Sequence, residues 1–453
     1  MNLIGTIFAL VCGYLVFQLP RRYAAVPFLL GAIYMTDGQV IEIGPFHFTI
    51  MRLLVLVGAC RIFLKHERLP GGFNLLDRLM VFWTAWVVAC SVFHEPFSAA
   101  IVSHLGFAYN RIGTYFLIRF FIRSFDDFRG VIKALLIMLL PLAAEMISEK
   151  FTGRNMFVLL GGIWDLEIRG GKIRAQGPFA HSILAGTAGA VCLPLALLFW
   201  KENRKLAILG IVATLGMVVA SASSGPILTT AAVIGGLVLW RVRNSMRQIR
   251  IALVLGIIGL ALVMSDPVYY VLAKIDLTGS STGWHRAALI DSALRYLDEW
   301  WFAGTDFTRH WMPTGIIANP NHTDITNVYI MMGVKGGLLL MFLFIACLGT
   351  AFSLVGKGMR LIKNGPGARL FILWTLGAIL LGHAITFLSV DYFDQTVVLY
   401  NFILASVSAL YSSLLLSSKI AAQVNVVEPT AKLGAEASSL KRDLNGNVSP
   451  NYS

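Results

Sequence analysis

Three stretches of the sequence hold residues that could act on a phosphate-linked substrate. The first, residues 172–181, reads KIRAQGPFAH and places Arg174 just before a Gly-Pro turn. A guanidinium matches phosphate oxygens with two parallel hydrogen bonds, which an ammonium cannot do. Arg174 is therefore a candidate anion-binding residue, with Lys172, Gln176 and His181 as candidate substrate contacts beside it. Alternatively, Arg174 only reaches the phosphates of membrane lipids.

The second stretch, residues 284–301, is predicted to form an amphipathic helix. Its apolar residues recur at spacings of three and four, and it ends in two tryptophans, a residue type that favours the membrane interface. Arg286 falls in the first turn, where free backbone N–H groups favour an anion. We therefore expect Arg286 to bind negative charge, although an ordinary surface helix would show the same apolar pattern.

The third stretch, residues 319–327, contains His322 and Asp324. A histidine can serve as a general base near neutral pH, and a neighbouring carboxylate can orient it or stabilise its charge. A loop histidine is more often simply polar. The chain has no HExxH, no paired histidine cluster and no DxD, so neither a metal nor a cofactor is expected.

The elements that must position these residues are predicted to be membrane helices. Of the 453 residues, 57% are hydrophobic and 13% are charged, whereas a soluble protein carries about 25% charged residues. Several apolar runs reach the ~20 residues that cross a bilayer, and each must be helical there to satisfy its own backbone. We predict an all-α, polytopic integral membrane bundle with about 12–13 transmembrane helices. The predicted spans are 2–19, 24–41, 48–64, 76–93, 99–122, 128–148, 181–200, 205–220, 225–240, 250–265, 324–354, 368–389 and 396–418.

The positions of the basic residues predict the orientation. Lys and Arg gather in alternate loops, such as those around Arg21, Arg61 and Arg243, and this asymmetry predicts that these loops are cytoplasmic. It also accounts for the net charge of +13 without a nucleic-acid partner. The N-terminus is then outside. Residues 1–418 form the membrane domain, and residues 419–453, which are rich in Ser, Asn, Lys and Glu, are predicted to be a disordered cytoplasmic tail.

Two outer loops, residues 149–180 and 266–323, also hold basic residues, although such residues have no role in orientation on that side. These charges are either solvated or form a joint anion site. Four further charges lie within or near spans, where ionisable residues often mark function, and Arg111 among them is a candidate substrate contact. The four are Arg52, Arg111, Glu145 and Lys335.

These residues resemble the O-antigen ligase and O-antigen polymerase superfamily of bacterial envelope glycosyltransferases. Arg174-Ala-Gln-Gly-Pro-Phe is similar to a family motif that precedes a Gly/Ala-rich helix. Residues 281–304 look like the family's arginine, helix and Gly turn. His322, with Gly-Val-Lys-Gly at 333–336, is similar to the family's "H-N…G-x-x-G" helix, although Thr323 replaces the Asn. The linker 221–225 is similar to a further family turn. Together the motifs cover residues 172–340.

The resemblance implies transfer of a glycan from an undecaprenyl-diphosphate-linked donor to a carbohydrate acceptor at the periplasmic face of a bacterial inner membrane, without a metal. Arg174 and Arg286 would stabilise the pyrophosphate leaving group, and His322 would take the acceptor proton. A polymerase for exopolysaccharide or O-antigen is favoured slightly over a ligase that acts on lipid A-core. Its partners would be membrane lipids, a flippase and a chain-length regulator. A lipid-linked glycan flippase and a non-catalytic scaffold are the alternatives of other classes.

Overall fold

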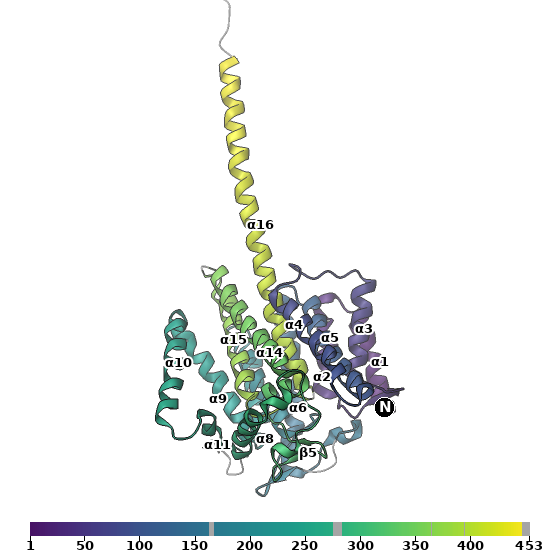
Figure 1. Cartoon of the computed structure of the whole chain (residues 1–453). Coiled ribbons are helices and arrows are strands. Elements are labelled where there is room, and N and C mark those ends of the chain that lie inside the picture. The colour runs from purple at the N-terminus through teal and green to yellow at the C-terminus, as the bar shows by residue number, and fades with distance from the viewer. Residues whose placement is uncertain (163–166, 275–282, 364, 394, 446–453) are drawn as a thin grey trace, which may run out of the picture.

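The protein is a bundle of helices with three short β-hairpins (Figure 1). The computed structural model describes residues 1–162, 167–274, 283–363, 365–393 and 395–445. The hairpins pair β1 (Val40–Ile43) with β2 (Phe46–Thr49), β3 (Ile168–Arg169) with β4 (Lys172–Ile173), and β5 (Ile317–Asn319) with β6 (His322–Thr323). The helices of ten or more residues are α1 (Leu3–Gln18), α2 (Ala25–Tyr34), α3 (Ile50–Leu64), α4 (Leu75–Cys90), α5 (Phe97–Phe121), α6 (Phe125–Thr152), α7 (Ser182–Leu197), α8 (Arg204–Ala220), α9 (Ser224–Val238), α10 (Met246–Val263), α12 (Gly283–Arg295), α14 (Val328–Leu361), α15 (Gly367–Thr386) and α16 (Thr396–Asn445).

The long helices are apolar enough to cross a membrane, which confirms the predicted helical, multi-pass class in its coarse form. Within the described residues, six helical segments meet that requirement: 75–93, 125–152, 224–263, 328–361, 367–386 and 396–420. Helices α1 and α7 are apolar but shorter. The helix α10 has no buried residue, and side chains such as Leu262 and Val263 are more than 80% exposed. An apolar helix exposed on all sides is stable in lipid, not in water.

The second predicted span, residues 24–41, is wrong in its second half. Helix α2 ends at Tyr34, and the chain turns through Thr36–Gln39 into strand β1. Gly38 lies so close to the backbone of Gly161 that an added Cβ would stand 2.2 Å from its carbonyl oxygen. The polar run Thr-Asp-Gly-Gln therefore interrupts the apolar stretch and supports a turn where hydropathy alone predicts a continuing helix.

The C-terminal helix differs from the predicted tail. The backbone of α16 remains helical through residues 419–445 and extends beyond the rest of the bundle (Figure 1), whereas composition predicts disorder from residue 419. Extending an existing helix adds one hydrogen bond for each residue fixed, without a new nucleation cost. Residues 446–453 lie outside the described residues.

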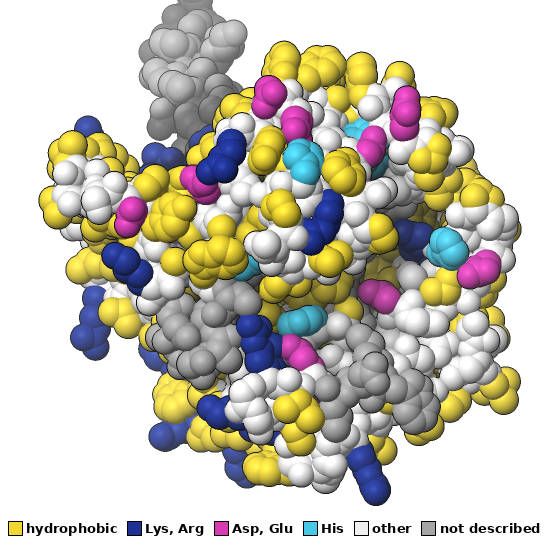
Figure 2. Space-filling model, turned by 60° about the horizontal axis from the view of Figure 1, so that its bottom comes forward, with side chains coloured by type: hydrophobic (Ala, Val, Ile, Leu, Met, Phe, Trp, Pro, Cys, Tyr) yellow, Lys and Arg dark blue, Asp and Glu magenta, His cyan; other side chains and the backbone are white. Residues whose placement is uncertain are grey.

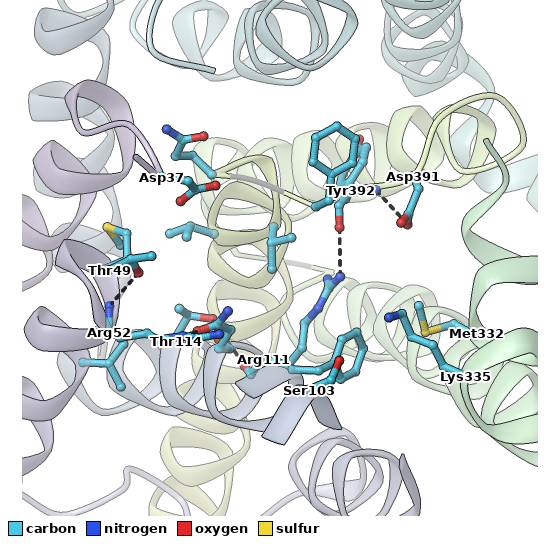
Figure 3. Close-up of a pocket in the computed structure, with 18 residues that line it drawn as sticks. Asp37, Thr49, Arg52, Ser103, Arg111, Thr114, Met332, Lys335, Asp391 and Tyr392 are labelled. Carbon is cyan, nitrogen blue, oxygen red and sulfur yellow. Dashed lines mark hydrogen bonds between the residues drawn. The ribbon is translucent and has the colours of Figure 1, made fainter. Parts of the chain in front are cut away.

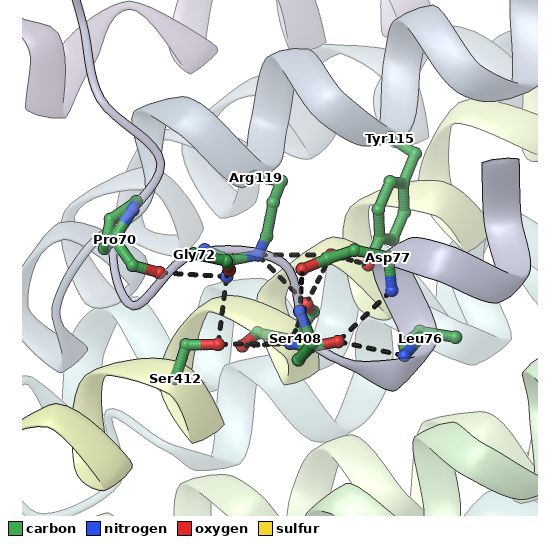
Figure 4. A network of polar contacts seen from close by, with 9 residues as sticks. Pro70, Gly72, Leu76, Asp77, Tyr115, Arg119, Ser408 and Ser412 are labelled. Atoms are coloured by element: carbon green, nitrogen blue, oxygen red, sulfur yellow. Dashed lines mark hydrogen bonds and ion pairs between the residues drawn. The ribbon is translucent and has the colours of Figure 1, made fainter.

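A buried polar network ties α4, α5 and α16 together (Figure 4). Arg119 and Asp77 are fully buried, with the Arg119 Nε 3.4 Å from the Asp77 Oδ1. Tyr115 and Ser408 also donate to that oxygen, at 2.6 and 2.8 Å. The Arg119 Nη2 donates to Ser412 and to two loop carbonyls. Buried charges are tolerated when paired and hydrogen-bonded in this way.

Helix α14 contains a break that holds a neighbouring loop. Gly336 and Gly337 have non-helical backbone angles, and Gly337 has a φ of +73°. The backbone groups released there find new partners: the Trp86 indole donates to the Gly336 carbonyl at 2.9 Å, and the Leu338 N–H donates to the Trp301 carbonyl at 2.8 Å. The Thr305 N–H donates to the Val334 carbonyl at 2.9 Å. Residues 301–305 are therefore attached directly to the break.

We expect the substitution Asp77→Ala to lower the free energy of unfolding by about 3–5 kcal/mol, because it leaves the buried Arg119 guanidinium without its carboxylate. Thermal unfolding in detergent measures this effect. Arg78→Ala, which removes the exposed neighbouring charge, is the matched control. Equal unfolding temperatures for the two variants would show that the network does not stabilise the bundle.

Candidate functional site

The two predicted outer loops lie at the same end of the bundle and enclose a cavity of about 760 Å³. Figure 2 shows this end of the molecule, with a hollow among His, acidic and basic side chains. The wall combines the segment between α4 and α5, the starts of α5, α7 and α14, helix α12, strand β3, hairpin β5–β6 and the segment between α15 and α16. Its ionisable lining residues are His94, Glu95, His104, Arg169, His181, Arg286, Asp306, His322, Asp324, Lys335 and Asp391.

Arg286 lies in the first turn of α12, as the sequence predicts for this helix, although residues 281 and 282 before it lie outside the described residues. Leu289 and Ala293 are buried and pack α12 onto the bundle. The Arg286 Nε donates to the Ser389 carbonyl at 3.2 Å, and no carboxylate of the described chain forms an ion pair with Arg286. Burial lowers the pKa of Arg286, and the charge of nearby Arg169 lowers it further. Two guanidiniums facing one cavity favour an anionic ligand.

His322 lines the same cavity from strand β6. Its Nδ1 is 3.1 Å from the Thr308 hydroxyl, and its backbone N–H donates to the Asn319 side chain at 2.9 Å. Burial lowers the pKa of His322; Asp306 opposes this shift, and Lys335 adds to it. The imidazole is therefore neutral at pH 7 and can accept a proton, as a general base must.

Arg174 does not line this cavity. It is buried behind the wall, where it pairs with Glu167 and its Nε donates to the Ser223 hydroxyl at 3.1 Å. Glu167 also accepts a 2.6 Å hydrogen bond from Ser182. These contacts tie the loop before α7 to the linker between α8 and α9. The guanidinium from this loop that lines the cavity belongs to Arg169.

The other predicted substrate contacts divide into three groups. His181 and Asp324 line the large cavity, and burial raises the pKa of Asp324 against the opposing charges of His285 and His181. Lys172 is exposed on β4, and Gln176 is buried with its backbone N–H 3.2 Å from the Glu149 carboxylate, so neither lines the cavity. Arg111 lines a second, adjoining cavity.

Several lining residues are not predicted from the sequence as part of a site. Lys335 stands out in the sequence only as a charge within a span, and Arg169 is only one of the basic residues of loop 149–180. Asp391, a carboxylate at the edge of an apolar segment, carried a usable signal, because ionisable residues at such positions often mark function.

A second missed feature is the contact between His94 and Asp306. The His94 Nδ1 lies 2.6 Å from Asp306 and its Nε2 lies 3.0 Å from the Ala303 carbonyl. These residues are more than 200 positions apart, so only the folded chain brings them together. The contact closes one side of the cavity wall.

No protein-family model matches the chain, and no curated protein matches it either.

Proposed function

We propose that this protein is a membrane glycosyltransferase that transfers or polymerises glycan units from an undecaprenyl-diphosphate-linked donor to an acceptor sugar hydroxyl. The observation that carries the proposal is the cavity in which Arg286 and Arg169 face the same space as His322. Positive charge for a diphosphate and a neutral base for a hydroxyl are the two requirements of such a transfer. The resemblance of residues 172–340 to the O-antigen ligase and polymerase superfamily supports the same reaction.

In the proposed reaction, the acceptor hydroxyl oxygen attacks the anomeric carbon of the donor sugar. The bond from that carbon to the diphosphate oxygen breaks, and its electron pair stays on the diphosphate. Arg286 and Arg169 stabilise the negative charge that develops there. His322 takes the proton of the attacking hydroxyl, and the negative charge of Asp306, which opposes the lowering of the His322 pKa, favours the imidazolium that forms. Asp324 lines the same cavity.

The proposed location is a bacterial inner membrane, with the cavity and the N-terminus periplasmic and the C-terminus cytoplasmic. The proposed topology has about 12–13 transmembrane helices. The position of the basic residues supports it: Arg61 and Arg119 lie in the last turns of α3 and α5, whereas His104, near the start of α5, lines the cavity. Fifteen helical residues separate His104 from Arg119, which corresponds to roughly 22 Å along the helix. The predicted cytoplasmic charges and the cavity therefore lie at opposite ends.

We expect His322→Ala and Arg286→Gln each to lower the rate of glycan transfer by roughly 10²–10⁴-fold, the range over which positioned proton transfer and charge stabilisation act. The assay uses the reconstituted full chain and an undecaprenyl-diphosphate-linked repeat unit as donor. A second carrier-linked repeat unit and lipid A-core are offered as separate acceptors, because only the former is elongated by a polymerase.

The matched controls for that experiment are His310→Ala and Arg295→Gln. His310 lies outside the cavity lining, and Arg295 is an exposed residue at the end of the same helix as Arg286. Wild-type transfer by His322→Ala and Arg286→Gln would overturn the proposal. Movement of the donor across the bilayer without elongation would favour a flippase instead.

A second prediction separates the two arginines of the loop before α7. We expect Arg169→Gln to lower the transfer rate per folded molecule more than Arg174→Gln, because Arg169 lines the cavity. Arg174→Gln should lower the unfolding temperature more, since it removes the partner of Glu167. Rates normalised to folded protein, together with thermal unfolding, measure both effects. The reverse order in the rates would return the anion-binding role to Arg174.

The pH dependence of transfer follows from the lowered pKa of His322. A base must be neutral, so the rate stays high as the pH falls through 6.5, the ordinary histidine value, and declines only when His322 takes up a proton below it. The kcat/KM for the donor, measured between pH 4.5 and 8, gives the inflection of the free enzyme. An inflection above 6.5 would contradict the assignment of His322 as the base.

A further inference from the structure

A second cavity of about 390 Å³ adjoins the first between α3, α5, α14 and the start of α16 (Figure 3). The two cavities have four lining residues in common, and these form the wall between them: Ser103, Lys335, Asp391 and Phe393. A ligand in the smaller cavity would therefore lie next to the space that His322 and Arg286 line.

Among the described residues that line the smaller cavity, cations outnumber carboxylates. Arg52, Arg111 and Lys335 are the cations, and Asp37 and Asp391 are the carboxylates. Figure 3 shows Arg111 and Lys335 reaching from α5 and α14 toward the part of the cavity near Asp391.

The contacts that Arg111 and Lys335 make within the described chain leave N–H groups of both side chains available to a ligand. The Arg111 Nη2 donates to the Tyr392 carbonyl at 3.2 Å. The Lys335 ammonium lies 5.7 Å from the centre of the Phe107 ring, and no hydrogen-bond acceptor is found for it among the residues that the structure describes. A half-buried ammonium that lacks such a partner favours an anionic ligand.

The same cavity also offers neutral hydrogen-bonding groups and aromatic faces. Gln395 is 3% exposed, and its amide nitrogen donates to the Met35 and Pro178 carbonyls at 2.6 and 2.9 Å. Those two bonds fix the side chain, and its carbonyl oxygen has no donor within the described chain. Asn110, Thr49 and the ring of Phe107 complete a lining of polar groups beside an apolar face.

We propose that the smaller cavity binds one anionic sugar unit, with its negative group between Lys335 and Arg111 and its hydroxyls against the polar part of the lining that includes Asn110 and Thr49. The negative group is a carboxylate, as in a uronic acid, or a phosphate. The role of this sugar as the acceptor of the transfer reaction rests on the proposed function, because only that function places a sugar beside His322. The binding itself does not depend on it.

Titration calorimetry of the purified full chain tests the proposal with four probes: glucuronate, glucose 1-phosphate, glucose and inorganic phosphate. We expect one or both of the anionic sugars to bind at least tenfold more tightly than glucose and inorganic phosphate, which corresponds to about 1.4 kcal/mol. The carboxylate and phosphate arms identify which negative group is preferred. Equal binding of glucose, or of inorganic phosphate, would overturn the proposal.

Variants locate the site. Lys335→Gln should weaken binding of the preferred anionic sugar at least tenfold, and Lys335→Arg should restore part of it. Lys357→Gln, an exposed lysine at the far end of α14, is the matched control. Asn110→Asp is a second variant that keeps shape and retains an acceptor for the Arg52 Nε, 3.0 Å away. Its added negative charge should weaken the anionic sugar more than glucose.

Two comparisons separate this inference from the proposed function. His322→Ala should bind the anionic sugar as the wild type does, even though it no longer transfers glycan. Selective binding that Lys335→Gln and Asn110→Asp leave intact would overturn the site. If the variants at His322 and Arg286 keep transferring glycan while the selective binding persists, the proposed function fails and the binding site stands.

Discussion

The interruption of α14 at Gly336 and Gly337 is the constraint on which the candidate site depends. Within an apolar bundle, the backbone groups released by such a break must find partners in the protein. Trp86 on α4 and residues 301–305 supply them, so the break fixes the loop to α14. Gly337 is required because an added Cβ would stand 2.1 Å from the Phe302 carbonyl oxygen. Lys335 immediately precedes the break and therefore enters both cavities from a fixed backbone.

The protein treats its buried charges in two different ways. At one end, the oxygens and nitrogens of Asp77 and Arg119 are largely satisfied by each other, by hydroxyls and by loop carbonyls, and this network holds three helices together. At the other end, Arg286 and Lys335 lie beside cavities without a carboxylate at ion-pair distance in the described chain. The first arrangement suits stability. The second suits recognition of an anion, because a ligand can supply the missing negative charge.

The sequence predicts the helices well, because hydropathy and the need to satisfy the backbone leave few alternatives in lipid. It also predicts that Arg286 and His322 belong to one region, and both residues line the larger cavity. The predicted span 24–41 is too long because the four polar residues 36–39 form a turn after the end of α2. Arg174 and Arg169 could not be ranked from the sequence, because the pairing of Arg174 with Glu167 and Ser223 depends on how the loop folds against a distant linker. The contact of His94 with Asp306 is equally non-local.

The exposed helix α10 shows that some segments of the chain tolerate substitution far better than others. None of its side chains is buried, so exchanging its Leu, Ile and Val residues among themselves would alter no buried packing. The sequence of α10 needs only to be apolar. At Gly333 in α14, by contrast, no larger residue fits, because an added methyl group would stand 2.4 Å from the Trp300 ring. The fold therefore depends on specific residues at a small number of close contacts around α14, such as those at Gly333 and Gly337. Long apolar segments such as α10 could be replaced by unrelated apolar helices of the same length.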